Sequence, residues 1–261
     1  MPVLAWILLA CLAGGLASVL VASVIAFRVQ ARLVPLLVSY AVGAMLGAVF
    51  LDILPHLFDG PGDHGGAAAL ILAGILGFFL LEKLLLWRHH HGHGESEGAP
   101  APGHGHAHDE GRSGWMVIVG DSFHNFTDGA IIAGAFLADV KVGVVTAAAI
   151  VAHEIPQEVG DFLVLLNSGF SKSKALLMNA LSSFAAILGA LLGYAALSVA
   201  QEWVPRMLAI AAASLIYVAI ADLMPGLHRR ARLRETAAQV TFIGLGIATL
   251  WAVHLALGAV D

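Results

Sequence analysis

Residues 114–166 have the sequence GWMVIVGDSFHNFTDGAIIAGAFLADVKVGVVTAAAIVAHEIPQEVGDFLVLL, in which two short polar stretches interrupt long apolar segments. The first stretch is HNFTDG, residues 124–129, and the second is HEIPQE, residues 153–158. Ionisable groups are costly in hydrocarbon, so they usually face the interior of a helix bundle and mark a pathway or a site. The rest of the chain is therefore expected to hold these two stretches face to face.

The composition indicates an all-α polytopic membrane protein. Of the 261 residues, 59% are hydrophobic and 12% are charged, whereas a soluble domain carries about twice that charged fraction. The single cysteine, Cys11, excludes an intrachain disulfide and any cysteine-based metal motif. The first apolar run has no basic residue before it, so we expect an uncleaved helix there. Eight membrane-spanning helices are predicted, near residues 3–27, 33–57, 67–87, 114–138, 142–166, 174–200, 203–227 and 237–260.

Basic residues in the short loops predict the orientation of these helices. Lys141 and Arg206 are the basic residues in the loops after even-numbered helices. Cytoplasmic loops are enriched in Lys and Arg, so both termini are expected outside. The chain then divides into helices one to three over 1–87, a cytoplasmic loop over 88–113 and helices four to eight over 114–261. The loops after odd-numbered helices carry ten basic residues: Arg28, Arg32, Arg88, Arg112, Lys172, Lys174, Arg229, Arg230, Arg232 and Arg234.

The loop over 88–113 is rich in Gly, Pro and His and has no apolar period, so it is not expected to form a packed core. Neutral imidazole is a common ligand for zinc, copper, iron and nickel. A flexible metal-binding loop that buffers or senses metal is the functional interpretation, and a solvated linker is the alternative. We do not expect core activity to require this loop. It holds seven of the thirteen histidines: His89, His90, His91, His93, His104, His106 and His108.

A short internal similarity links the second and seventh predicted helices. The second ends in LDILPH, over 51–56, and the seventh in ADLMPGLH, over 221–228. Because these helices cross in opposite directions, the two motifs are expected at opposite membrane faces. This pattern favours an inverted repeat of helices 1–3 and 6–8 around helices 4 and 5, as transporters often have, although a coincidence of a few residues is the alternative.

The fourth predicted helix carries its polar residues on one face. Asp121, His124, Asn125 and Asp128 are spaced i, i+3, i+4 and i+7, which aligns two carboxylates, an imidazole and an amide. Gly129 on this helix, like Gly160 on the next, is expected to let helix backbones approach closely.

The fifth predicted helix has a matching stripe. His153 and Gln157 are spaced i, i+4, and Glu154 and Glu158 repeat that spacing, with Asp161 one turn further along. Pro156, inside the stretch, leaves a backbone carbonyl without its helical donor, so a kink or a cation contact is expected there.

The two polar stripes should meet near the bilayer midplane. At a rise of about 1.5 Å per residue, His124 and His153 lie roughly 21 Å and 17 Å below the same surface. Mixed nitrogen and oxygen ligands suit borderline divalent metals, and zinc usually takes four. More than four candidate ligands indicates two adjacent metal positions or one metal that shifts. The alternative is that these polar groups hydrogen-bond helices together.

HNFTDG resembles the fourth-helix pattern His-Asn-x-x-(Asp/Glu)-Gly of the ZIP family of divalent-metal transporters. HEIPQEVGDF resembles the fifth-helix pattern His-Glu-x-Pro-His-Glu of the histidine-rich branch of that family. The resemblance implies metal ligands at His124, Asn125 and Asp128, and at His153, Glu154 and Gln157. Two departures are Gln157, where the family commonly has His or Glu, and a sixth helix without the carboxylate that some bacterial members have there. Glu158 and Asp161 are expected to compensate.

Further residues are expected along the pathway rather than at its centre. Asp52, His56 and Met45 on the second helix resemble pathway residues. Asp222 and His228 lie near the expected cytoplasmic exit. His254 is as consistent with a structural role as with a functional one. Access from outside is expected past a group formed by His56, Asp59, Asp63 and His64.

The resemblance implies uptake of metal into the cytoplasm, usually Zn²⁺ and sometimes Fe²⁺, Mn²⁺ or Cd²⁺. A metal exporter of another fold is one alternative. An intramembrane zinc hydrolase is another, because HEIPQ differs by one residue from HExxH, but Gln157 and Pro156 argue against it. No nucleotide-binding motif is present in the sequence. We expect a transporter without enzymatic activity, with no nucleic acid partner, a homodimer as one assembly, and a bacterial cytoplasmic membrane as its location.

Overall fold

A computed structural model describes residues 2–28, 34–59, 63–90, 112–228 and 232–258, and these form helices joined by short turns, with no strand among them. The expected all-α fold is therefore confirmed. Most of the His-rich loop, residues 91–111, lies outside the described residues. In chain order the helices are α1 (Val3–Arg28), α2 (Val34–Ala48), η1 (Val49–Ile53), α3 (Leu54–Asp59), α4 (His64–His90), α5 (Arg112–Ala138), α6 (Val140–Asn167), α7 (Lys172–Ser183), α8 (Ala185–Val199), η2 (Gln201–Trp203), α9 (Val204–Tyr217), η3 (Val218–Leu223), α10 (Met224–His228) and α11 (Leu233–Gly258).

Six helical segments in the described part of the chain are long and apolar enough to cross a membrane. These six are Val3–Val24, Val34–Asp59, His64–Leu81, Lys172–Val199, Gln201–His228 and Leu233–Leu257. Helices α5 and α6 have 27 and 28 residues, which corresponds to about 40 Å of helix and is also long enough. They are absent from the six because polar residues interrupt their apolar sequence.

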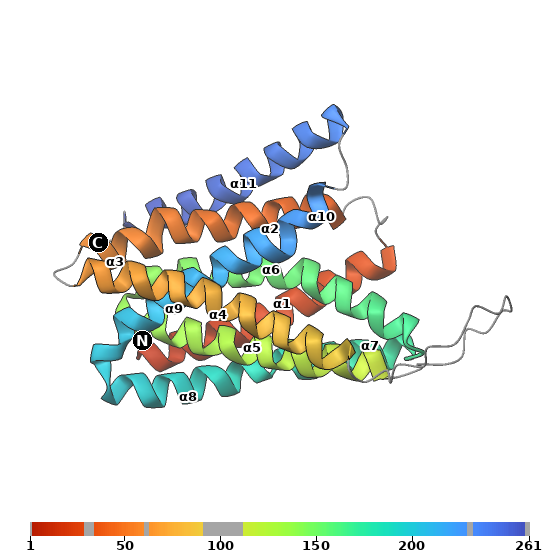
Figure 1. Cartoon of the computed structure of the whole chain (residues 1–261), viewed down its shortest axis with the longest axis horizontal. Coiled ribbons are helices and arrows are strands. Elements are labelled where there is room, and N and C mark those ends of the chain that lie inside the picture. Colours follow the sequence, from red (N-terminus) through yellow and green to blue (C-terminus); the bar gives the residue numbers. More distant parts are fainter. Residues whose placement is uncertain (1, 29–33, 60–62, 91–111, 229–231, 259–261) are drawn as a thin grey trace, which may run out of the picture.

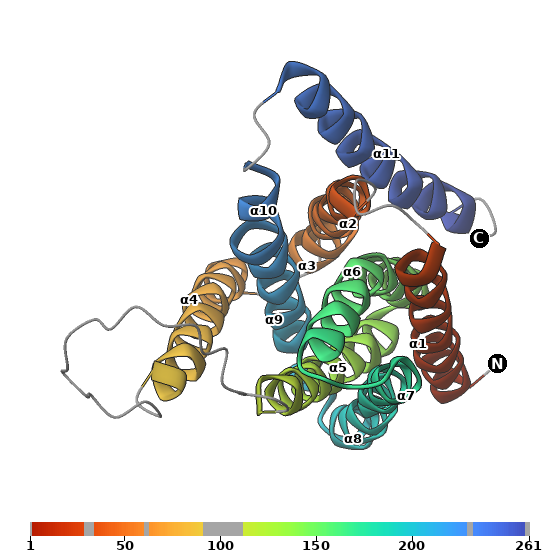
Figure 2. The same ribbon diagram turned by 90° about the vertical axis from the view of Figure 1, so that its right-hand side faces the viewer.

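The polar helices α5 and α6 lie inside the bundle. Viewed along the bundle (Figure 2), α1 lies beside α6, α7 and α8 lie beside α5, and α2 and α9 close the opposite side. Helices α4 and α11 lie at the periphery, against α9 and α2 respectively. In the side view (Figure 1) the start of α1 and the end of α11 lie toward the same end of the bundle. The residues that are costly in hydrocarbon are thus surrounded by the apolar helices.

Glycine lets α5 pack closely against α8. A Cβ on Gly129 would lie 1.8 Å from the Ala186 carbonyl oxygen, and one on Gly189 would lie 1.9 Å from the Phe126 carbonyl oxygen. The expected close approach at Gly129 is therefore confirmed. The matching expectation for Gly160 is wrong, because among the described residues no heavy atom outside its own helix backbone lies within 4 Å of a Cβ placed there.

The two Asp-x-x-Pro motifs adopt the same unusual backbone. In η1 the Leu54 N–H donates to the Val49 carbonyl, and in η3 the Met224 N–H donates to the Ala219 carbonyl, both five residues back. Each donor directly precedes a proline. A proline has no backbone N–H to donate, and in a regular α-helix its ring clashes with the carbonyl of the residue four positions before it. A wider π-helical turn relieves this clash, and such turns are frequent at functional sites. The sequence similarity between these segments is therefore matched in backbone geometry.

The close contact between α5 and α8 predicts that Gly189→Ala destabilises the protein. The added methyl group meets a backbone oxygen, so the helices must separate, at a cost of about 1–3 kcal/mol. Thermal unfolding in detergent measures this as a lower midpoint. Gly160→Ala is the matched control, and its midpoint should stay equal or rise because alanine favours a helix. Equal midpoints for Gly189→Ala and the unmodified protein would contradict the described packing.

Candidate metal centre

The turn between α5 and α6 brings the two polar stretches together. Only Asp139 separates the helices, and its side chain caps α6 by accepting from the backbone N–H groups of Lys141 and Val142, at 2.7 and 3.2 Å. The helices therefore run antiparallel. His124 lies 14 residues before the end of α5 (138 − 124) and His153 lies 13 residues after the start of α6 (153 − 140). Both imidazoles are thus about 20 Å from this end of the bundle.

Four ligand-type side chains converge at this depth. The Nε2 atom of His153 lies 3.2 Å from His124 Nε2, 3.2 Å from Asp128 Oδ2 and 3.5 Å from Glu154 Oε1. His124 Nε2 lies 3.7 Å from the same Asp128 oxygen and 3.8 Å from the same Glu154 oxygen. All four atoms lie within 4.8 Å of one another. We refer to His124, Asp128, His153 and Glu154 as the midplane cluster.

The midplane cluster is buried and has unused lone pairs. Asp128, His153 and Glu154 are 2%, 1% and 5% exposed. Within the described part of the chain, Asp128 Oδ2 and both Glu154 carboxylate oxygens are buried without a hydrogen-bond partner. Burying such groups unpaired costs several kcal/mol. The four atoms could together donate electron pairs to one divalent cation, and two imidazoles with two carboxylates suit a borderline metal such as Zn²⁺.

A second layer lies one helical turn away, around Asp121. Asn125 Nδ2 and Gln157 Nε2 both donate to Asp121 Oδ1, at 3.1 and 3.0 Å. Asp121 and Asn125 are 6% and 4% exposed. The structure thus places these three predicted site residues together, with the two amide nitrogens directed at a carboxylate.

A third layer connects α6 to α7, and its α7 members were not among the predicted site residues. Ser183 Oγ donates to Glu158 Oε1 at 2.6 Å, and Asn179 Nδ2 donates to the Glu158 backbone carbonyl at 2.9 Å. Glu158 is fully buried, and its second oxygen, Oε2, has no hydrogen-bond partner among the described residues. The spacing of Asn179, Ser182 and Ser183 at i, i+3 and i+4 in an apolar helix was the available signal.

Asp52 lies apart from the midplane cluster and pairs with α11. Its Oδ1 atom lies 2.7 Å from His254 Nδ1, and the Trp251 ring stacks on that imidazole with ring centroids 5.7 Å apart. Asp52 is 5% exposed, and its Oδ2 atom is buried without a hydrogen-bond partner in the described structure. His254 therefore has a defined partner that the sequence alone did not reveal.

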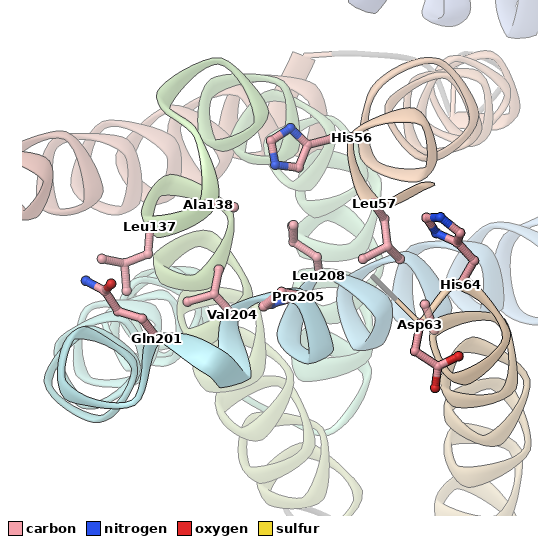
Figure 3. A pocket seen from close by; sticks show the side chains of 11 residues that line it. His56, Leu57, Asp63, His64, Leu137, Ala138, Gln201, Val204, Pro205 and Leu208 are labelled. Carbon is pink, nitrogen blue, oxygen red and sulfur yellow. The ribbon is translucent and has the colours of Figure 1, made fainter. Parts of the chain in front are cut away.

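His56 lines a cavity of about 430 Å³ at the end of the bundle where α5 meets α6. Figure 3 shows His56 on α3, Asp63 and His64 at the start of α4, and Gln201 around this cavity. Residues at the end of α5 and the start of α9 also line it. Three of the four side chains expected at the access route, His56, Asp63 and His64, thus share one cavity.

The remaining predicted residues are more dispersed. Asp59 is exposed at the end of α3, Asp161 is half-buried on α6, and Met45 is fully buried in the core. His228 is exposed at the end of α10. Asp222 lies in η3, and its side chain is outside the described structure.

Comparison with known proteins gives one family. Residues 89–254 match the family model described as ZIP Zinc transporter. Zinc transporter ZIP10 of Mus musculus is 42% identical over 111 residues, which cover 42% of this chain and 13% of that relative. Zinc transporter YKE4 of Saccharomyces cerevisiae is 31% identical over 239 residues, covering 82% of this chain and 69% of the relative. The ZIP13 homolog of Drosophila melanogaster, also a zinc transporter, is 29% identical over 274 residues, covering 85% of this chain and 77% of the relative.

These relatives bear on two expectations from the sequence. They are named as transporters rather than enzymes, which agrees with the expected absence of enzymatic activity. They are also eukaryotic, so the bacterial cytoplasmic membrane expected from composition stays a prediction.

The geometry of the midplane cluster predicts that His153→Ala weakens zinc binding at least about tenfold, because His153 contacts the other three members. Loss of even a residue that only hydrogen-bonds a metal ligand typically lowers metal affinity by about tenfold or more. Isothermal titration with Zn²⁺ in detergent measures it, using protein whose seven His-rich-loop histidines are replaced by serine. His254→Gln is the control and should bind as tightly as its parent, since its imidazole contacts Asp52. Equal losses in both variants would show that the midplane cluster is not the site.

Proposed function

The chain belongs to the ZIP zinc transporter family, and we propose that it carries Zn²⁺ through the membrane into the cytoplasm by way of the midplane cluster. The family is one of transporters rather than enzymes, and its members are multi-pass membrane proteins. Because the chain covers only 13% of some of its relatives, the activity and the transported ion belong to this proposal. Fe²⁺, Mn²⁺ and Cd²⁺ are further candidate ions.

One observation supports this proposal most directly: the convergence of His124, Asp128, His153 and Glu154 from two buried helices, with unused carboxylate oxygens between them. The two carboxylates offset the charge of a divalent cation in a low-dielectric setting, and the two neutral imidazoles add nitrogen ligands. The absence of cysteine from this set favours release, because a site built wholly of thiolates holds zinc tightly.

The route on either side of the midplane cluster follows from two further features. The 430 Å³ cavity with His56, Asp63 and His64 suits the outer opening, where ions are first captured. The layers around Asp121 and Glu158 suit the inner half of the route, because they lie on the far side of the cluster from the α5–α6 turn. Asp52 is assigned to the wall of the route, held by His254.

The membrane topology that we propose has eight spans, with α5 and α6 as the fourth and fifth. The lengths of α5 and α6 support their inclusion. Matching π-helical turns in the second and seventh spans support an inverted repeat of spans 1–3 and 6–8. Both termini are assigned outside on the distribution of basic residues, with residues 88–113 in the cytoplasm. A homodimer is a further proposal.

Reconstituted vesicles test transport and its direction. Zn²⁺ added to the outer face of the protein should enter vesicles that contain a metal-sensitive dye. His124→Ala and Glu154→Ala should each lower the initial flux at least about tenfold, since each removes one of the four ligands. Glu235→Gln, which removes a carboxylate from the first turn of α11, is the control and should transport normally. Flux only from the cytoplasmic face would overturn the proposed direction, and unchanged flux in both ligand variants would overturn the proposed site.

The His-rich loop is expected to bind metal without being required for transport. Replacing its seven histidines with serine should lower the number of zinc ions bound per chain, because imidazole is a zinc ligand. The same variant should keep most of the flux in vesicles, since the midplane cluster is unchanged. Loss of flux in this variant would assign the loop an essential role instead.

A further inference from the structure

A second cavity lies between the first two turns of α4 and those of α9, away from the midplane cluster. Its volume is about 280 Å³, close to the lower end of the range for small-molecule sites, about 300–1,000 Å³. It shares Asp63, Ala67 and Pro205 with the 430 Å³ cavity (Figure 3). Leu70 and Ala209 form part of its apolar wall. We refer to it as the α4–α9 cavity.

One guanidinium lines the α4–α9 cavity and is held in a defined position. The Cζ atom of Arg206 lies 4.6 Å from the centre of the Trp203 ring, and its Nη1 donates to the Glu202 backbone carbonyl at 3.3 Å. A guanidinium has five N–H donors, so others remain for a ligand. Within the described part of the chain, Arg206 forms no ion pair with Glu202 or Asp63. Its positive charge is therefore available to an anionic group, and its fork of donors suits phosphate.

Two carboxylates line the same cavity. Asp63 Oδ1 accepts from the Gly66 backbone N–H at 2.9 Å, which fixes this acid at the start of α4, and Glu202 is exposed in η2. A metal ion is a poor occupant, because the guanidinium repels a cation and no imidazole is among the described lining residues. A simple anion is also poor, because the two carboxylates repel it. A ligand with separate positive and negative groups complements both kinds of charge.

The cavity lies where two membrane spans begin. The candidate spans His64–Leu81 and Gln201–His228 both start beside it, and Trp203 next to it is 53% exposed. Trp is enriched where a membrane meets water. No residue of the span His64–Leu81 is buried, and Leu72 and Leu76 on it are 59% and 58% exposed. A molecule with its polar end in the cavity can thus lay apolar chains along α4.

We propose that the α4–α9 cavity binds the head group of a phospholipid that carries a primary ammonium. Arg206 binds the phosphate, and Glu202 and Asp63 accept hydrogen bonds from the ammonium. A primary ammonium has three N–H donors, whereas the quaternary ammonium of a choline head group has none, so the acids distinguish these two lipids. The carboxylates also disfavour a lipid with net negative charge. This binding does not depend on metal transport.

Native mass spectrometry of the purified, delipidated full-length protein measures the binding of added lipids. Phosphatidylethanolamine should bind at least about tenfold more tightly than phosphatidylcholine or phosphatidylglycerol with the same acyl chains. A hydrogen bond to a charged group contributes about 1.5–3 kcal/mol, which corresponds to tenfold or more. Equal affinity for phosphatidylethanolamine and either of the other two lipids would overturn the inference.

Variants of the charged residues test the assignment of each group. Arg206→Gln should lower the affinity for phosphatidylethanolamine at least about tenfold, because it removes the charge that meets the phosphate. The double variant D63N/E202Q should abolish the preference for phosphatidylethanolamine over phosphatidylcholine, and asparagine can still cap α4. Lys141→Gln is the control, since Lys141 is a basic residue at the same end of the bundle but outside the cavity lining. Unchanged affinity in Arg206→Gln, a preserved preference in D63N/E202Q, or an equal loss in Lys141→Gln would overturn the inference.

A soluble head group separates a lipid site from a site for small phosphate esters. Glycerophosphoethanolamine has the same phosphate and ammonium but no acyl chains. At the same concentration as the bound lipid it should not displace phosphatidylethanolamine, because it lacks the apolar chains that lie along α4. Displacement as effective as that by unlabelled lipid would show that the chains do not contribute, and would overturn the assignment of the cavity to a lipid.

Discussion

The constraint on which the rest of the structure depends is the burial of two imidazoles and two carboxylates at the middle of a helix bundle. Unpaired ionisable groups are costly in hydrocarbon, and Asp128 and Glu154 keep oxygens without hydrogen-bond partners in the described structure. Two neighbouring features determine how the cluster is assembled. The single-residue turn at Asp139 sets the depth at which α5 and α6 meet, and glycine lets α8 cover α5 closely. Helices α5 and α6, which carry the cluster, are not among the six described segments that are apolar enough to count as candidate membrane spans.

The polar residues beyond the midplane cluster form layers with different chemistry. The cluster itself presents free lone pairs, and in the layer around Asp121 two amides donate hydrogen bonds to one carboxylate oxygen. In the layer around Glu158 a hydroxyl donates to one carboxylate oxygen, and the other oxygen has no hydrogen-bond partner in the described structure. The carboxylates beyond the cluster therefore differ in how many hydrogen bonds they accept in the described structure.

The sequence predicted the members of the cluster because two simple rules fix them. Helical spacing aligned His124 with Asp128, and equal distances from one turn put His153 at the same depth. The rest depended on contacts between distant segments. The pairing of Asp52 with His254 joins residues 202 positions apart, and no local pattern encodes it. Asn125 and Gln157 were predicted as ligands from their position, and their bonds to Asp121 could not be read from that position because they depend on how α5 and α6 pack. The polar face of α7 was overlooked because it carries hydroxyls and an amide instead of a carboxylate.

Anomalous diffraction at the zinc edge from crystals grown with Zn²⁺ tests the central claim most directly, because it locates the ion without reference to transport. The strongest peak within the helix bundle should lie about 2.0–2.2 Å from His124 Nε2, His153 Nε2 and the facing oxygens of Asp128 and Glu154, with the Gln157 amide turned toward Asp121. A strongest peak in the bundle at the Asp52–His254 pair or beside Glu158, with none between α5 and α6 at the midplane cluster, would contradict the account.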